Sequence, residues 1–434
     1  MPIRLDAAAA DFPDRFAALL AMKREASEDV DRAVAAIIEA VRARGDAALI
    51  DYSRRFDRVD LAALGIAVGE AEIEAARADC DGDALAALEV AAARIRAYHA
   101  RQSPQDRRWT DAEGVELGWR WSAVDSAGLY VPGGTASYPS SVLMNAIPAK
   151  VAGVKRLVVV MPAPDGKLSP LALVAAKLAG VDEIYRVGGA QAVAALAYGT
   201  RTIRPVAKIV GPGNAYVAAA KRRVFGTVGI DMIAGPSEVV VLADASANAD
   251  WIAADLLAQA EHDAAAQSIL ITDDSSLAER VERAVESQLA TLPRRDIAGA
   301  SWRDYGAIIL APSLAAAIPL VDRLAPEHLE IVAADDEALA ARIANAGAIF
   351  LGAHTPEAIG DYVAGSNHVL PTARSARFAS GLSTLDFMKR TSLLRCDARA
   401  LAALAPHAVA LAQAEGLDAH GRSVSIRLDA EAPR

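Results

Sequence analysis

Gln259 and His262 are side chains whose types and spacing could do chemistry. They stand at i and i+3 at the end of an apolar-periodic segment, Trp251 to His262, so a helix there would present both on one face. Asp361 and His420 lie later in the chain and could join them only through folding. A metal ion held by these four groups would be bound through nitrogen and oxygen, with positions left for a substrate. The same spacing also fits an ordinary polar helix face, so both interpretations stay open.

Glu327 and His328 form a second candidate pair, in the segment APEHLE. Pro326 restricts its own φ and the residue before it, so this corner of the chain should be stiff. Neighbouring side chains there could serve one pocket from different angles, and a glutamate with a histidine could exchange protons with a substrate. The alternative is an exposed corner that caps a strand.

Three Gly-rich turns follow strand-like segments and lead into helical patterns. They are residues 130–134 (YVPGG), 187–191 (VGGAQ) and 211–214 (GPGN). In open α/β sheets ligands settle at the carboxyl ends of strands, where helix N-termini offer free N–H groups to phosphate. We therefore expect a nucleotide here, although none of the turns is G-x-G-x-x-G and no acidic residue follows at the distance typical of a ribose contact. The alternative is that the glycines only permit tight turns.

Composition limits the class of protein. The 434 residues exceed one ordinary core, and the net charge of −10 argues against a nucleic-acid partner, because binding phosphates takes clustered cations. The two cysteines, Cys80 and Cys396, form no C-x-x-C motif, so we expect neither a disulfide framework nor a thiolate zinc site. The N-terminus has no secretory pattern and no apolar run is long enough to span a bilayer, so we expect a soluble cytoplasmic protein without a membrane partner.

The hydrophobic pattern predicts an α/β protein with two parallel sheets. The first hundred residues look helical, with one apolar stripe that begins after a capping Ser27 and ends at Gly45, and another from Leu85 to Tyr98. Further along, short β-branched runs alternate with helical patterns, as in Rossmann-like folds, but without the usual glycine fingerprint. The expected strands are 156–161, 183–187, 208–210, 238–242, 268–272, 307–310 and 348–351.

We expect four parts along the chain. They are an N-terminal helical extension (1–25), a larger α/β domain with the metal and substrate site (26–128 with 236–381), a second α/β domain with the Gly-rich turns (129–235), and a C-terminal helical tail (382–434). The tail is too small to own a core. We therefore expect it to pack on a partner subunit.

Long, ordered motifs carry a resemblance to a known family. They are GLYVPGGTASYPSSVLMNAIPAKVAGV, VGGAQAVAALAYGT, KIVGPGNAYVAAAKR, IDMIAGPSEVVVLAD, LLAQAEHD, APEHLEI, GSNHVLPT and AEGLDAHGRSV. With these segments the chain resembles the histidinol dehydrogenase family over nearly its whole length. The motifs are mostly unrelated to those of other dehydrogenases, so the resemblance is specific.

The resemblance implies a reaction and its cofactors. It implies oxidation of L-histidinol to L-histidine through L-histidinaldehyde, with two hydride transfers to NAD, as the last step of histidine biosynthesis. It also implies one Zn²⁺ per subunit, held by Gln259, His262, Asp361 and His420, that orients the substrate while NAD carries the electrons. A homodimer is implied whose C-terminal tails cross, so that Glu415 and His420 enter the partner's active site.

The resemblance also assigns roles to single residues. His328 would be the acid and base for the proton transfers, and Glu327 would activate the water that hydrates the aldehyde. The residues implied to contact substrate are Ser237, Gln259, His262, His328, Asp361, Glu415 and His420, and those implied to contact NAD are Tyr130, Gln191 and Asn214. His368, in SNHV, would have a structural role near the site. Neither cysteine lies in a motif, which favours a route without a thiohemiacetal.

Two other classes of function compete with this interpretation. A zinc-dependent hydrolase could use Glu327 to activate water for attack on an amide or ester, although H-E-x-x-H is absent and a hydrolase needs no nucleotide turns. A noncatalytic, metal-dependent binding module is a third alternative.

Overall fold

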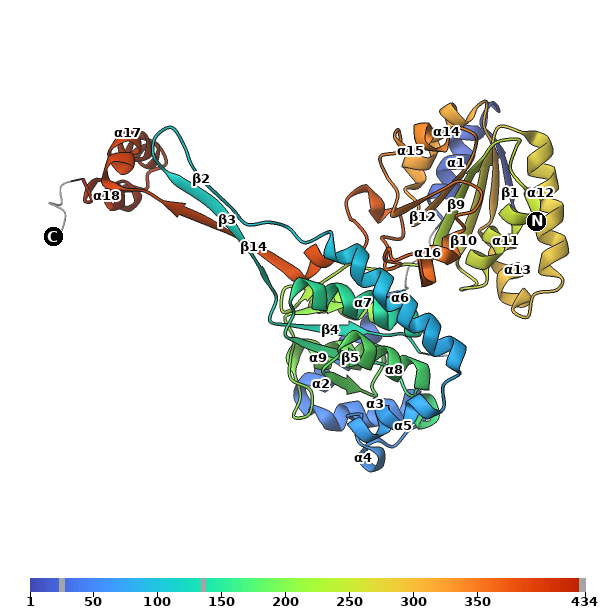
Figure 1. Cartoon of the computed structure of the whole chain (residues 1–434), viewed down its shortest axis with the longest axis horizontal. Helices are drawn as coiled ribbons and strands as arrows, with labels where there is room; N and C mark the ends of the chain where they lie inside the picture. The colour runs from blue at the N-terminus through green and yellow to red at the C-terminus, as the bar shows by residue number, and fades with distance from the viewer. Residues whose placement is uncertain (23–27, 134–137, 429–434) are drawn as a thin grey trace. The chain divides into compact units, whose positions relative to one another are not determined.

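The computed structural model describes residues 1–22, 28–133 and 138–428. The chain divides into two compact units (Figure 1). The first contains residues 1–102 and 125–387, and the second contains residues 103–124 and 388–434. The expected cap at Ser27 and the glycine Gly134 of the first turn lie outside the described residues.

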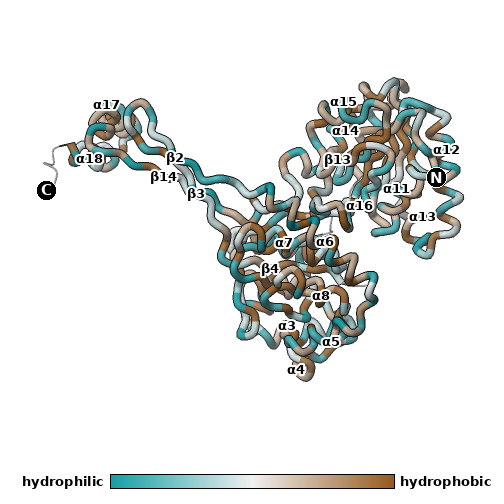
Figure 2. The backbone as a smooth tube through the Cα atoms, in the orientation of Figure 1, coloured by the Kyte–Doolittle hydropathy of each residue, from teal (hydrophilic) through white to brown (hydrophobic). Residues whose placement is uncertain are grey.

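The first unit contains a five-stranded parallel sheet, in the order β6-β5-β4-β7-β8. Its strands are β4 (Ser126–Tyr130), β5 (Arg156–Val160), β6 (Glu183–Tyr185), β7 (Lys208–Val210) and β8 (Gly229–Ile230). The helices between them are α7 (Pro139–Ala152), α8 (Pro170–Ala179), α9 (Gly189–Tyr198) and α10 (Ala215–Val224), with a short 3-10 turn η1 (Pro164–Gly166). Strand β4 is central and almost wholly buried, as its apolar composition requires (Figure 2).

The N-terminal helices pack on this sheet, which corrects the expected domain grouping. Helices α2 (Glu28–Arg44) and α3 (Asp46–Phe56) share one core with α9, α10 and β5, so residues 28–56 accompany 129–235 rather than 236–381. Helices α5 (Glu70–Ala78) and α6 (Gly82–Ala100) contact α8, and α4 (Leu61–Leu64) links the two pairs. The apolar side of an amphipathic helix must pack on another apolar surface, and either sheet could provide one. The order of segments along the chain does not show which sheet it is.

A six-stranded parallel sheet, in the order β1-β11-β10-β9-β12-β13, forms the rest of the first unit. Its strands are β1 (Ile3–Asp6), β9 (Glu238–Ala243), β10 (Gln267–Thr272), β11 (Ala307–Leu310), β12 (His328–Val332) and β13 (Ala348–Leu351). One face is covered by α11 (Ala249–Ala260), α12 (Ser275–Leu289) and α13 (Arg295–Asp304), and the other by α1 (Phe12–Leu20) and α14 (Leu314–Leu324). The remaining elements are α15 (Asp336–Ala340), α16 (Glu357–Tyr362), η2 (Ser375–Arg377) and η3 (Thr384–Phe387).

Strand β1 corrects a second expectation. Residues 1–25 were expected to form a helical extension, but Ile3 to Asp6 pair in parallel with β11 at the edge of this sheet. The pattern IRLD is too short for its period to distinguish a strand from a helix.

The second unit is a three-stranded antiparallel sheet followed by two helices. Strand β3 (Glu116–Ala123) lies between β2 (Arg107–Thr110) and β14 (Met388–Arg395), and α17 (Ala398–Ala414) and α18 (Asp418–Ser425) follow β14. The tail from residue 382 was expected to be helical, and this prediction is wrong for Met388–Arg395, which form β14 and pair with β3 along the whole strand. Leu394 and Leu411 are 71% and 65% exposed, so this unit leaves these large apolar side chains uncovered.

The α/β class with parallel sheets is confirmed, and each of the seven expected strands has a counterpart. Two central strands, β4 and β12, did not appear among the expected segments. Within the described ranges, no helix combines the length and apolar character that a bilayer span would need.

The packing of α3 on the five-stranded sheet predicts the effect of a single core substitution. Leu49 is fully buried in the core that α2, α3 and α9 share, so Leu49→Ala should lower the free energy of unfolding by about 2–5 kcal/mol. Leu64→Ala, at a side chain 46% exposed in α4, is the matched control and should change it by less than about 1 kcal/mol. Chemical denaturation measures both, and equal stability of the two variants would contradict this packing.

Candidate active site

His328 begins β12 at the amino edge of the six-stranded sheet. It pairs with Val239 of β9, whose side chain belongs to the core under α11, so the imidazole points to the α11 face. Its Nδ1 lies 3.0 Å from the carbonyl oxygen of Glu238. Because a carbonyl oxygen only accepts, Nδ1 carries a hydrogen, and the neutral ring keeps its lone pair on Nε2. That Nε2 is buried and has no hydrogen-bond partner among the described residues.

Three carboxyl groups surround this imidazole. Asp361 Oδ1 lies 3.7 Å from Nε2, and Glu357 Oε2 and Glu327 Oε2 lie 3.7 and 3.8 Å from Nδ1. Burial disfavours the charged ring, but Glu357, Glu327 and Asp361 outweigh it and raise the pKa of His328 well above its usual value. The sequence did not single out Glu357, although its i, i+4 spacing to Asp361 placed both on one helix face.

Glu327 is buried beside His328 and accepts a hydrogen bond from the backbone N–H of Glu238 at 2.9 Å. Burial raises the pKa of Glu327 to about 7, which the positive charge of His328 and that hydrogen bond only partly oppose. Together with Ser237 and His368, Glu327 lines a small pocket of about 50 Å³. A buried carboxyl with a pKa near neutrality, at a pocket wall, can act as a general base.

Gln259 and His262 meet at the end of α11. Gln259 Nε2 lies 3.2 Å from His262 Nδ1, so the expected i, i+3 adjacency is confirmed, although His262 lies in the turn after the helix. Gln259 Oε1 is buried without a partner in the described part of the chain. Burial lowers the pKa of His262, which favours the neutral imidazole that a metal ion needs.

Asp361, in α16, is the anionic member of the group. Burial opposes its ionisation, but the His328 ring 3.7 Å away and the nearby His368 and His262 hold the pKa of Asp361 below its usual value. His368 Nδ1 contacts the carbonyl oxygen of Asp361 at 2.9 Å and its Nε2 lies 3.2 Å from Ser141 Oγ, contacts that suit a structural role. The first unit thus brings Gln259, His262 and Asp361 near one another, with Gln259 buried, Asp361 partly buried and His262 exposed.

Glu415 and His420 belong to the second unit. Glu415 ends α17 and His420 lies in α18, and both side chains are exposed. Their expected part in the site stays a prediction.

The Gly-rich turns lie at the carboxyl ends of β4, β6 and β7, as expected. Tyr130 ends β4 and its hydroxyl oxygen accepts the N–H of Gly189 at 3.0 Å, which ties the first turn to the second. Gln191 is buried in α9. Asn214 caps α10, and its Oδ1 accepts the N–H groups of Tyr216 and Val217. These helix N-termini therefore offer fewer free N–H groups than we expected.

A buried ion pair stabilises the third Gly-rich turn, residues 211–214. Lys221 and Asp231 pair with side chains only 2% and 1% exposed. Lys221 Nζ also donates to the carbonyl oxygen of Gly211, and Asp231 Oδ2 accepts the N–H of Gly211 at 2.8 Å. Gly211 has φ +110, and a Cβ there would lie 2.2 Å from the carbonyl oxygen of Tyr130, so only glycine fits.

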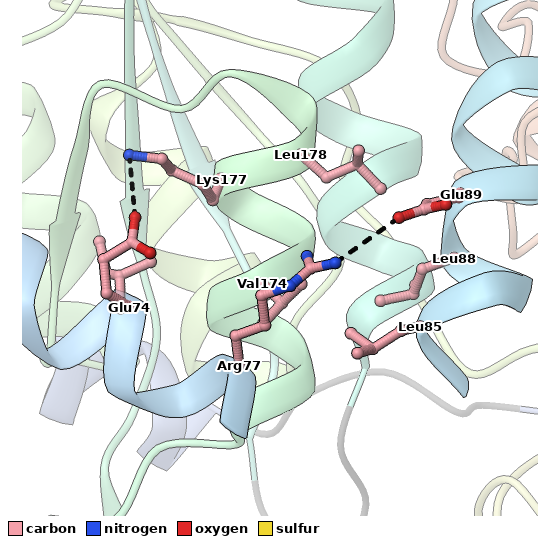
Figure 3. A pocket seen from close by; sticks show the side chains of 9 residues that line it. Glu74, Arg77, Leu85, Leu88, Glu89, Val174, Lys177 and Leu178 are labelled. Atoms are coloured by element: carbon pink, nitrogen blue, oxygen red, sulfur yellow. Dashed lines mark ion pairs between the residues drawn. The ribbon is translucent and has the colours of Figure 1, made fainter. Parts of the chain in front are cut away.

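A larger pocket lies away from these residues, between α5, α6 and α8 (Figure 3). It holds about 230 Å³ over an apolar floor, and the ion pairs Arg77–Glu89 and Lys177–Glu74 lie at its rim. None of the candidate site residues lines it.

Comparison with known proteins gives a consistent result. The family model described as histidinol dehydrogenase matches residues 20–428. The chain is 68% identical to the histidinol dehydrogenase of Mesorhizobium japonicum and 69% identical to that of Bradyrhizobium diazoefficiens, in each case over 99% of this chain and 100% of the relative. A crystal structure of histidinol dehydrogenase from Elizabethkingia anophelis is 36% identical, covers 98% of both chains and superposes with a TM-score of 0.94.

The buried ion pair between Lys221 and Asp231, beside the turn at residues 211–214, predicts a large loss of stability when one partner is removed. Lys221→Met leaves Asp231 buried without its cation, and should lower the free energy of unfolding by about 3–5 kcal/mol. Adding Asp231→Asn removes the unpaired charge and should recover part of this loss. Lys177→Met, which breaks an exposed pair, is the control and should cost less than about 1 kcal/mol. Denaturant unfolding tests this, and equal losses in the two lysine variants would contradict it.

Proposed function

Since the chain belongs to the histidinol dehydrogenase family, we propose that it oxidises L-histidinol to L-histidine through L-histidinaldehyde, in histidine biosynthesis, with NAD and Zn²⁺. The observation that carries the proposal is the full-length identity of 68% to a histidinol dehydrogenase. The buried group of His328, Glu327 and Asp361 supports it, because a four-electron oxidation of an alcohol needs bases where it removes protons.

Gln259, His262 and Asp361, with His420 of the neighbouring subunit, would hold the zinc ion. The donor set fits: an unpartnered buried amide oxygen, an imidazole biased to its neutral form and an ionised carboxylate are all suitable ligands. Among the described residues no three His, Cys, Asp or Glu side chains form a metal-binding group. The proposed set would supply only two such groups from the first unit, because Gln259 is an amide and His420 belongs to the second.

Tyr130, Gln191 and Asn214 would contact NAD at the carboxyl edge of the five-stranded sheet. The glycines of the three turns support this, because they let a ligand approach the backbone closely. When bound, NAD accepts hydride, and zinc fixes and orients the substrate.

His328 would take the hydroxyl proton of the substrate on Nε2. The carbonyl oxygen of Glu238 holds the ring and keeps the hydrogen on Nδ1, so the free lone pair faces Asp361 rather than the backbone. The raised pKa of His328 would keep the ring protonated while its carboxylate neighbours are all ionised. A cation on Asp361 would oppose that effect and return the ring to its basic form.

Glu327 would activate water for hydration of the aldehyde. An aldehyde must be hydrated before a second hydride can leave, so this step needs a base of its own. The pKa of about 7 leaves Glu327 ionised in a large fraction of molecules at neutral pH.

A homodimer would complete the site, with Glu415 and His420 reaching the partner's substrate. The second unit supports this, because a concentration of exposed large apolar side chains is typical of interaction sites. They are Leu394, Leu404, Leu411, Leu417, Ile426 and Leu428. A zinc-dependent hydrolase that uses Glu327 is the alternative function, and no contact in the first unit favours it over the dehydrogenase.

One assay separates these functions. Addition of L-histidinol and NAD should raise the absorbance of NADH, with two NADH formed per histidinol consumed, and a chelator should abolish the signal until zinc is restored. Hydrolysis of an amide or ester without formation of NADH would contradict the proposal and favour the hydrolase.

Glu327→Gln should separate the two oxidations. The variant keeps a hydrogen-bond acceptor for the Glu238 N–H but loses the base, so conversion of histidinaldehyde should fall by about 10²–10⁴-fold while oxidation of histidinol is largely spared. Rapid-mixing assays that start from each substrate measure the two steps.

The pH profile provides an independent check. A base must be ionised, so aldehyde conversion by the unsubstituted enzyme should decline as pH falls through about 7, the pKa of Glu327, and Glu327→Gln should lack this limb. Equal losses in both steps, or an unchanged acid limb in the variant, would show that Glu327 is not the water-activating base.

A further inference from the structure

Three acidic residues form a second layer beneath the candidate metal-site residues. Each lies on the same face of the same element as a site residue. On strand β12, Glu330 follows His328 by two residues, so both side chains point to the α11 face. On helix α11, Asp255 precedes Gln259 by four residues, and on helix α16 Glu357 precedes Asp361 by four.

Direct contacts join Glu330 to Asp255 and to the backbone of Glu357. Glu330 Oε1 accepts the backbone N–H of Glu357 at 2.6 Å, which fixes the first residue of α16 to strand β12. The carboxyl groups of Glu330 and Asp255 hydrogen-bond each other, which links β12 to α11. Helices α11 and α16 contact one another. The two helices that carry Gln259 and Asp361 are therefore tied to the same side chain, Glu330.

Such a cluster can exist only if protons are retained. A hydrogen bond between two carboxyl groups requires one of them to carry a hydrogen, and Glu330 Oε2 is buried with no N–H or O–H donor in the described ranges. Burial, with the neighbouring Asp255 and Glu357, raises the pKa of Glu330 to about 9, and burial raises that of Asp255 to about 6. The pair of Glu330 and Asp255 therefore retains a proton, which the two carboxyl groups share.

We propose that Asp255 and Glu330 are positioning residues that, through the backbone N–H of Glu357, set the separation of α11 from α16, and thereby the distance between Gln259 and Asp361 across the metal site. The proposal rests on the proposed function, because it assumes that these two residues bind one ion. Residues that contact metal ligands generally act in this way, because they hold each ligand in the orientation that binding requires and so reduce the conformational entropy lost on binding.

The test compares two substitutions of Glu330 that differ in hydrogen bonding more than in size. Glu330→Gln keeps an acceptor oxygen for the Glu357 N–H and can donate to Asp255 as a protonated glutamate does. Glu330→Leu keeps much of the volume and loses both contacts. Leu329→Met, on the opposite face of the same strand, is the control for general disturbance of β12. Zinc affinity of the metal-depleted full-length protein is measured by competition with a chromophoric chelator.

We expect Glu330→Leu to weaken zinc binding by about tenfold to a hundredfold, and Glu330→Gln and Leu329→Met to bind zinc within about threefold of the unsubstituted protein. Zinc affinity of Glu330→Leu equal to that of the unsubstituted protein would overturn the inference, as would equal losses in the Gln and Leu variants. Failure of the unsubstituted protein to bind zinc would instead overturn the proposed function.

Asp255 provides a second test should Glu330→Leu fail to fold. Asp255 is only half-buried, so its substitution disturbs the core less. Asp255→Asn keeps an acceptor for Glu330, whereas Asp255→Leu removes it, and the same order of zinc affinities is expected. An Asp255→Leu variant that binds zinc as tightly as Asp255→Asn would overturn the inference.

Discussion

The structure of the site depends on one buried imidazole held among carboxyl groups. His328 is almost fully buried, and Glu327, Glu357 and Asp361 all lie within 4 Å of its ring nitrogens. Charges so close in a low dielectric cannot all be present without compensation. Protons on Glu327 and Glu357, a positive ring on His328 and a bound cation are the available compensations. How they are distributed decides which groups can act as acids and which as bases.

Sheet geometry explains why these groups meet. Because β12 runs parallel to its neighbours, its first residue, His328, lies at the amino edge of the sheet. Helices α11 and α16 run back towards that edge, and Gln259 and Asp361 lie near their C-terminal ends. The Gly-rich turns lie instead at the carboxyl edge of the five-stranded sheet, where nucleotides usually bind. The proposed metal site thus lies at the amino edge of the six-stranded sheet, and the proposed nucleotide site lies at the carboxyl edge of the five-stranded sheet.

Much of this could be predicted from the sequence, and the failures have physical reasons. The β-branched runs gave seven strands and the class of fold, because period and composition are local signals. The partner of α2, the edge strand β1 and the strand β14 were missed, because pairing and packing depend on segments distant in the chain. The motifs indicated Gln259, His262 and Asp361. Glu330 and Glu357 were overlooked, because an acid in a strand or a short helix gives no sign of burial.

We propose that Gln259, His262 and Asp361 of the first unit bind one zinc ion. Anomalous diffraction at the zinc absorption edge, from crystals of the full-length protein grown with zinc, tests this most directly. We expect one strong peak per chain, about 2.0–2.3 Å from ligand atoms of Gln259, His262 and Asp361. A peak at other residues, with none beside these three, would contradict the account.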